Sequence, residues 1–429
     1  MDKRYQNSEQ MLQRALKSIP LGTQTFSKSK IQYPYGVSPY FIQKGKGSYV
    51  WDVDGNKYID FVNGLCPIIL GYNDIDVVSA VRKQLKEGTI FSLSHPIEID
   101  VAEKIIDMVP CAEMVRFGKN GSDATSGAIR LARAYTKRER VAVCGYHGWH
   151  DWYIGSTTRN LGVPKSTVNL THKFNYNDIN SLFNVFKKYP NQISAVIMEP
   201  MNIQWPKNNF LLEVKELTHK NGAVLIFDEV ITGFRFSEGG AQELFGVVPD
   251  LVTLGKGMAN GYPLSAIAGK ASIMKLLAEV FYSSTFGGET LSLAASLATM
   301  NKIQQQSVVG FVKKQGEKVV NGLNKLIEKY ELSLVFDVAG HPSWSFLIIK
   351  DFEKYSNWQI KTLFLQEMFK KGILTFGTHV MSFAHKDKDI EYLLNSYDEI
   401  FVLIKKVLKD KSLDKYLKCK PLEPLFKVR

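Results

Sequence analysis

The sequence predicts an α/β protein with a large domain, in which helices flank a mostly parallel central sheet, and a smaller α+β domain formed by both chain ends. Two observations support this class. Between residues 140 and 270, short apolar runs typical of buried strands alternate with helical segments, as in parallel sheets covered on both faces. The length of 429 residues exceeds one hydrophobic core, so we expect segments 1–69 (small domain and dimer contact), 70–320 (large domain) and 321–429 (small domain).

The elements are expected in the following order. A helix covers 8–19, where apolar residues recur at helical spacing until Pro20 and Gly22. Residues 40–61 have the alternation and the turn residues of a β-meander. The later elements share the same two periodicities, with helices over 77–85, 101–108, 361–370 and 390–408 and strands over 140–144, 195–198, 224–227, 251–254, 265–268, 334–336 and 346–349.

The composition argues against several classes of partner. The 54 basic and 42 acidic residues leave a net charge of +12, but the lysines are dispersed, which favours anionic small molecules over nucleic acid. The apolar runs are far too short for a membrane span, and no secretory signal opens the chain, so a cytoplasmic protein is expected. The four cysteines are scattered without a CxxC pair, which predicts reduced thiols and no metal site.

Distinctive residues follow four of the predicted strands. They are Tyr146-His147-Gly148, Glu199-Pro200, Asp228-Glu229 and Gly255-Lys256. In sheets of this kind, ligands bind beyond the carboxyl ends of the strands. We therefore expect these residues to gather at one edge of the large-domain sheet.

Lys256 and Asp228 are candidates for the two groups that an aldehyde cofactor with a pyridine ring needs most. An amine holds the aldehyde as a Schiff base, and a carboxylate keeps the ring nitrogen protonated. Lys256 lies among small residues that would let a cofactor approach, and Asp228 ends an apolar strand where an unpaired carboxylate is costly. The alternatives are a solvent-facing loop lysine, and a structural aspartate bonded to loop amides or to Arg235.

A phosphate site is expected where Gly121 and Ser122 lead into a helix, with Ser122 as the N-cap. The loop from Ser283 to Thr290 has the same composition and could complete it, although either segment could simply be a capped helix. Tyr146 is suited to stack on a flat ring, and the alternative is a packed loop. The histidines near it lack the further ligands of a metal site.

At this point the residues match a known family. The chain resembles class III, fold type I aminotransferases that use pyridoxal 5′-phosphate, and most closely the glutamate-1-semialdehyde 2,1-aminomutase branch. The match extends over nearly the whole length and includes the segments Tyr49-Val50-Trp51-Asp52-Val53-Asp54-Gly55-Asn56, Ile129-Arg130-Leu131-Ala132-Arg133, Tyr146-His147-Gly148, Glu199-Pro200, Phe227-Asp228-Glu229-Val230, Thr232-Gly233-Phe234-Arg235 and Gly255-Lys256-Gly257.

The resemblance implies the following roles. Lys256 is the Schiff-base lysine, and Asp228 is the partner of the pyridine nitrogen. Thr285 is a phosphate ligand donated by the neighbouring subunit, which implies a homodimer. The other cofactor-binding residues that it implies are Gly121 and Ser122 at the phosphate, Tyr146 and Val230 on the two ring faces, Gln204 near the ring hydroxyl, and His147 and Glu199 in the strand-end motifs.

Departures from the branch pattern concern the substrate side. The segment that usually carries a substrate-side arginine reads Thr23-Gln24-Thr25-Phe26-Ser27-Lys28, and Phe376-Gly377-Thr378-His379 replaces a glutamate-bearing stretch. We therefore favour an aminotransferase with an amino donor and a carbonyl acceptor, in sugar or polysaccharide metabolism. The alternatives are an aminomutase and a non-catalytic binder of the cofactor. Whether Arg159, Arg235 or His379 contacts substrate stays open.

Overall fold

The computed structural model describes residues 3–423, and the chain divides into two compact units. Of the described residues, the first comprises those up to Leu65, Ile69–Asp74 and those from Phe311. The second comprises Cys66–Ile68 and Ile75–Gly310. Both ends of the sequence therefore build the first unit. No helix among the described residues is both long and apolar enough to cross a bilayer.

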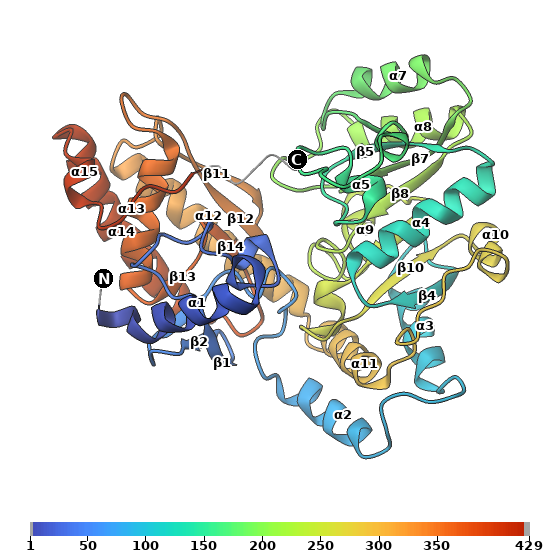
Figure 1. Cartoon of the computed structure of the whole chain (residues 1–429), viewed down its shortest axis with the longest axis horizontal. Coiled ribbons are helices and arrows are strands. Elements are labelled where there is room, and N and C mark those ends of the chain that lie inside the picture. Colours follow the sequence, from blue (N-terminus) through green and yellow to red (C-terminus); the bar gives the residue numbers. More distant parts are fainter. Residues whose placement is uncertain (1–2, 424–429) are drawn as a thin grey trace. The chain divides into compact units, whose positions relative to one another are not determined.

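A seven-stranded sheet organises the second unit (Figure 1). Its order is β4 (Met114–Gly118), β10 (Ser265–Gly269), β9 (Leu251–Leu254), β8 (Val224–Asp228), β7 (Ile193–Met198), β5 (Arg140–Cys144) and β6 (Thr171–Lys173). The pairings from β9 to β6 are all parallel, whereas β10 is antiparallel to both of its neighbours. The predicted mostly parallel sheet is confirmed, and β10 is its single reversed strand.

Helices cover both faces of this sheet because its strands are apolar on both sides. On one face, α4 (Gly121–Thr136) packs Ala128 and Leu131 against Val141, Ile197 and Ile226. The other face packs against two helices that lie side by side in Figure 1, namely α7 (Ile179–Lys188) and α8 (Phe210–Lys220). The central strands β7 and β8 are buried along their whole length, as expected for a sheet enclosed between helices.

The remaining helices of the second unit surround this core. The longest, α11 (Thr290–Gln305), lies against α2 and α3. Glu289 caps its first turn by accepting from the amides of Leu291 and Ser292. The others are α2 (Ile75–Leu85), α3 (Ile97–Met108), α5 (Asp151–Ile154), α6 (Lys165–Val168), α9 (Ala241–Phe245) and α10 (Ala271–Met274), with the 3-10 turns η4 (Lys256–Ala259) and η5 (Lys275–Ala278).

The first unit contains two small sheets. One has the order β1 (Ile42–Lys46), β2 (Tyr49–Asp52), β3 (Lys57–Asp60) and β13 (Ile373–Leu374), and the other is β11 (Phe336–His341), β12 (Trp344–Ile349) and β14 (Thr378–Val380). The meander predicted over 40–61 therefore forms β1 to β3, and the distant strand β13 joins β3 in parallel.

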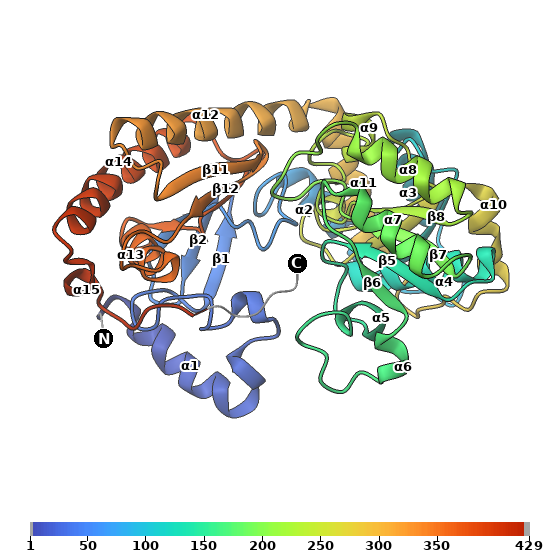
Figure 2. The same cartoon turned by 90° about the horizontal axis from the view of Figure 1, so that it is seen from above.

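Helices from both chain ends complete this unit. They are α1 (Gln6–Ser18), α12 (Val308–Lys329), which starts in the second unit, α13 (Asn357–Lys370), α14 (Asp387–Lys409) and α15 (Leu413–Tyr416). Figure 2 shows α13 and α14 adjacent to each other, and Phe364 stacks on Tyr397 between them, 5.5 Å between ring centroids. These aromatic side chains are fully buried, so they form the core of the unit.

Candidate active site

Asp228 lies at the carboxyl end of β8, where Thr253 of the neighbouring strand β9, the backbone amide of Val230 and His147 from the chain after β5 bond to it. His147 Nδ1 lies 2.8 Å from Asp228 Oδ2. The hydroxyl of Thr253 and the amide of Val230 donate to Oδ1 at 3.1 and 3.2 Å. The carboxylate is buried, with 6% exposure, yet Arg235 is not among its hydrogen-bond partners.

The donors around Asp228 leave room for one more. A carboxylate offers about four acceptor positions, and the three hydrogen bonds fill two on Oδ1 and one on Oδ2. A protonated ring nitrogen fits the remaining position on Oδ2 and would supply the charge that a buried carboxylate needs. On the far side of the imidazole, His147 Nε2 is buried without a hydrogen-bond partner among the described residues.

The start of α4 differs from the expected cap. The helix begins at Gly121, and its N-cap is Asn120 in an extended conformation, so the prediction that Ser122 is the N-cap is wrong. Ser122 lies inside the first turn, and its hydroxyl accepts from the amide of Trp149 at 3.3 Å. The carboxylate of Asp123 holds the preceding turn by accepting from the amides of Lys119 and Asn120. First-turn amides lack intrahelical acceptors, so those of Gly121 and Ser122 are suited to a phosphate.

Val230 lies between the start of α4 and the chain just before Lys256. A Cβ built on Gly121 would lie 3.0 Å from Val230 Cγ1, and one on Gly255 would lie 3.4 Å from the same atom. Lys256 opens η4 with φ 44, in the left-handed region, which costs a residue with a Cβ about 1–2 kcal/mol. Backbone strain of this kind gathers at functional sites.

Glu199 fixes the backbone of Tyr146. Its Oε2 accepts from the Tyr146 amide at 2.9 Å, and Asn202 Nδ2 donates to both carboxylate oxygens at 3.1 Å. Gly145 makes this approach possible, because a Cβ there would lie 2.6 Å from Glu199 Oε2. The Tyr146 ring meets Tyr153 edge-on and is about one-third exposed, which leaves ring surface available for stacking.

Two predicted residues do not share the hydrogen bonds of this cluster. Gln204 is exposed, and its Oε1 accepts from Asn177 Nδ2 at 3.4 Å. Thr285 is exposed in the loop between η5 and α11. Thr253, by contrast, bonds to Asp228 and was absent from the predicted set. Its only signal was a hydroxyl within the apolar run Leu251–Leu254.

Neither Arg235 nor His379 reaches a surface. Arg235 is fully buried in the second unit, and its Nη2 donates to the carbonyl of Cys66 at 2.8 Å. His379 is fully buried in the first unit, with Nδ1 3.1 Å from the Ser345 hydroxyl and Nε2 2.7 Å from the Tyr397 hydroxyl. These hydrogen bonds tie both side chains to the surrounding protein.

Replacing His379 by glutamine is expected to reduce the loss of stability that occurs as the pH falls below about 6.5. Burial lowers the pKa of His379 to about 3, whereas an unfolded histidine titrates near 6.5. As pH falls below about 6.5, the unfolded chain binds a proton that the folded chain refuses, so stability is lost by about 1.4 kcal/mol per pH unit. Urea unfolding of both proteins at about pH 5 and about pH 7 checks this. An equal change in the free energy of unfolding between the two pH values in both proteins would contradict it.

Replacing Gly148 by alanine is expected to weaken cofactor binding about tenfold or more. Gly148 has φ +99, and a Cβ there would lie 2.2 Å from Ser122 Oγ and 3.1 Å from Ser122 Cα, so the start of α4 must shift. Titration of the apoprotein with pyridoxal 5′-phosphate measures the effect. Gly162→Ala is the matched control, because Gly162 has φ +90 but nothing within 4 Å of its built Cβ. Equal loss in both variants would attribute the effect to backbone strain alone.

Comparison with known proteins shows the family to which this chain is similar. The aminotransferase class-III sequence family matches residues 32–396. Glutamate-1-semialdehyde 2,1-aminomutase of Persephonella marina is 38% identical over 85% of this chain and 92% of its own. The 3-aminobutyryl-CoA aminotransferase of Cloacimonas acidaminovorans is 35% identical over 88% of this chain and 94% of its own. The structure of the PLP internal aldimine form of the FumI protein of Sphingopyxis sp. MTA144 superimposes with a TM-score of 0.87 at 27% identity, covering 96% of this chain and 98% of that one.

These relatives correct the functional expectation in two respects. Neither of the two enzymes is named for a sugar substrate, so the lead toward sugar metabolism is not supported. Five further relatives, 34–36% identical, are also glutamate-1-semialdehyde aminomutases, which favours the aminomutase alternative over the aminotransferase that we expected. The chain therefore belongs to the class-III aminotransferase family, whose cofactor is pyridoxal 5′-phosphate, and it is an aminotransferase or aminomutase.

Proposed function

We propose that this protein moves an amino group on pyridoxal 5′-phosphate that is held covalently by Lys256, with Asp228 as the partner of the ring nitrogen. The arrangement of Asp228 carries the proposal. It is a buried carboxylate with one open acceptor position, at the same sheet edge as Lys256 and the start of α4. With the cofactor bound, the protonated ring withdraws electrons from a bond at the substrate carbon.

Each residue of the site has a defined task in this proposal. Lys256 Nζ would hold the cofactor through its aldehyde and, when free, would carry the proton that leaves the substrate carbon. Tyr146 and Val230 would cover the two faces of the ring. Gly121 and Ser122 hold the phosphate with their amides. Lys256 would be unnecessary in a mere binder of the cofactor, so its presence argues against a non-catalytic protein.

An aminomutase reaction is the first candidate, because six of the relatives carry that name. An aminotransferase that uses a separate donor is the second. It is supported by the 3-aminobutyryl-CoA aminotransferase relative and by the loss of the branch's arginine in Thr23–Lys28. Turnover of glutamate-1-semialdehyde without an added donor would establish the first candidate. A donor requirement with release of a keto product would establish the second. An absence of half-reactions with a panel of amino compounds would sink both.

We also propose that the protein acts as a homodimer in which Thr285 reaches the neighbouring subunit's phosphate site. Large apolar side chains are exposed on the second unit near this part of the sequence, including Phe286 at 57% and Phe281 at 79% exposure. Leu93 is 86% exposed in the segment between α2 and α3. A contiguous surface of exposed apolar groups is typical of a site that a partner covers, and we place these three side chains in one such surface.

Replacing Leu93 by aspartate is expected to raise the dimer dissociation constant about tenfold or more, because an interface would have to bury the new charge. Sedimentation equilibrium across a dilution series measures it. Leu161→Asp is the control, because Leu161 is as fully exposed but lies between α5 and α6. A wild-type monomer at all concentrations, or equal weakening by both substitutions, would refute the proposed interface.

A further inference from the structure

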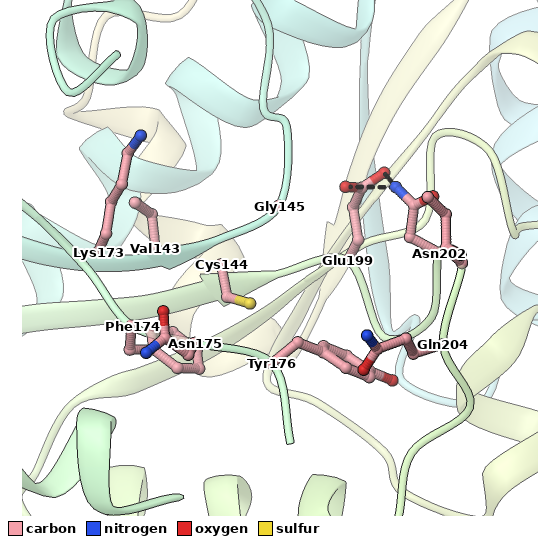
Figure 3. Close-up of a pocket in the computed structure, with 11 residues that line it drawn as sticks. Val143, Cys144, Gly145, Lys173, Phe174, Asn175, Tyr176, Glu199, Asn202 and Gln204 are labelled. Carbon is pink, nitrogen blue, oxygen red and sulfur yellow. Dashed lines mark hydrogen bonds between the residues drawn. The ribbon is translucent and has the colours of Figure 1, made fainter. Parts of the chain in front are cut away.

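A cavity of about 490 Å³ lies in the second unit at the carboxyl ends of β5, β6 and β7 (Figure 3). It is contiguous with the proposed site, because Gly145 and Glu199 line it and also flank the backbone of Tyr146. Its size is within the range of small-molecule sites. Apart from Gln204, which the resemblance places near the ring hydroxyl, the other residues of its lining have no task assigned above.

The cavity lining contains acceptor atoms that can take a further hydrogen bond. Asn202 Oδ1 is buried and has no hydrogen-bond partner among the described residues, while Nδ2 of the same side chain is committed to Glu199. A buried acceptor without a donor is costly, so a ligand N–H at this position would be favoured. The Tyr176 hydroxyl donates to the Pro200 carbonyl at 2.6 Å and keeps a lone pair for a second donor. Asn175 adds a side-chain amide to the same lining.

Charge is distributed unevenly along the cavity. Figure 3 shows Glu199 and Lys173 on opposite sides, with Cys144 between them. The Glu199 carboxylate would repel an anionic group next to it, whereas the Lys173 ammonium would attract one at the exposed side. An elongated ligand with one anionic end is therefore oriented with that end at Lys173.

Apolar side chains supply the rest of the lining. Phe174 and Ile203 offer carbon surface, and burial raises the pKa of the Cys144 thiol to about 12, so the thiol stays neutral. A ligand covered with hydroxyls would leave its polar groups unpaired against these walls. A ligand with methylene or methyl groups between its amides would place carbon against these apolar side chains.

We propose that this cavity binds the amide-bearing arm of an acyl substrate whose far end carries a phosphate or a similar anion. The amide N–H groups meet Asn202 Oδ1 and Tyr176, an amide carbonyl meets Asn175, and the anion meets Lys173. This inference rests on the aminotransferase candidate of the proposed function, since it assigns a place to the part of the substrate that does not react.

Two probes that differ only in a terminal phosphate test the assignment. Pantetheine presents the amides alone, and 4′-phosphopantetheine adds the anion. Calorimetric titration of the wild-type protein with bound cofactor is expected to show tighter binding of the phosphorylated probe, by about fivefold. Lys173→Met should abolish that preference while leaving the affinity for pantetheine unchanged. Asn175→Ala should weaken both probes to the same extent, by about three- to tenfold.

Lys188→Met is the matched control, because Lys188 is an exposed lysine of the same unit outside the cavity. The proposal is overturned if neither probe binds, or if Lys173→Met and Lys188→Met change the preference equally. Probe binding needs no amino transfer. A protein that binds both probes as expected but converts no amine would refute the proposed function alone. A protein that is active but binds neither probe would refute the cavity assignment alone.

Discussion

Replacing Lys256 by alanine is expected to lower the rate of amino transfer by about 10³-fold or more and to prevent covalent attachment of the cofactor. The reason is that a single side chain performs two tasks, as the nucleophile toward the aldehyde and as the carrier of the proton at the substrate carbon. Lys256 is placed for both by its position at the start of η4, directly after Gly255, which packs against Val230. The measurement is borohydride reduction followed by mass spectrometry of the peptide that contains residue 256, together with single-turnover kinetics.

Lys220→Ala is a suitable control for this experiment. Lys220 is an exposed lysine at the end of α8, so its loss removes one ammonium group without disturbing the sheet edge. It should retain the reduced adduct and wild-type rates. Repeated turnover by Lys256→Ala, or an adduct on another lysine in the wild-type protein, would show that the covalent attachment is assigned to the wrong residue.

Replacing Asp228 by asparagine is expected to weaken cofactor binding about 10- to 100-fold and to slow catalysis further. The substitution keeps the shape of the side chain but removes the charge that the protonated ring nitrogen requires, and a charge-assisted hydrogen bond contributes roughly 1.5–3 kcal/mol. Catalysis suffers beyond binding because a neutral ring withdraws fewer electrons from the substrate carbon. Titration of the apoprotein with pyridoxal 5′-phosphate and half-reaction kinetics separate the two effects.

Asp250→Asn controls for the loss of a buried carboxylate in the same sheet. Asp250 precedes β9 and bonds to Lys270 at 2.6 Å and to His219 at 2.9 Å. Although burial raises its pKa, these two partners and the Leu225 amide bring the pKa below its ordinary value, so the side chain is anionic. Its substitution should reduce thermal stability and leave cofactor affinity near that of the wild type. Equal loss of affinity in both variants would mean that Asp228 has only a structural role.

The strands of the large sheet were predictable because apolar runs of four to six residues can be buried only between two layers of helices. The reversed direction of β10 was not, since an apolar run such as Ser265–Gly269 contains no signal for its direction. The sequence also contained no signal for which strands, distant along the chain, pair with each other. The register that places Thr253 opposite Asp228 follows from the packing of the whole sheet, so the Thr253 hydrogen bond could not be foreseen.

Residue type and strand ends predicted the places of Lys256, Asp228 and Tyr146, each of which lies at or just beyond the carboxyl end of a strand. Their roles in the site stay predictions. The site was less predictable where the path of a loop decides which way a side chain points. Gln204 was assigned from its distance in sequence to Glu199. In the structure its side chain accepts from Asn177 and lines the same cavity as Glu199, so its role near the ring stays a prediction. Ser122 suits a helix cap by composition, yet Asn120 takes that position because the helix starts one residue before Ser122.

The pairing of β3 with β13 has a consequence for synthesis on the ribosome. Ile59 and Ile373 are partners in this ladder but lie 314 residues apart (373 − 59). At about 5–20 residues per second, the amino-terminal hairpins emerge roughly 15–60 seconds before the strand that closes their sheet. During that interval one sheet edge stays open to intermolecular pairing, so the nascent chain is a natural client for a chaperone that shields exposed strands.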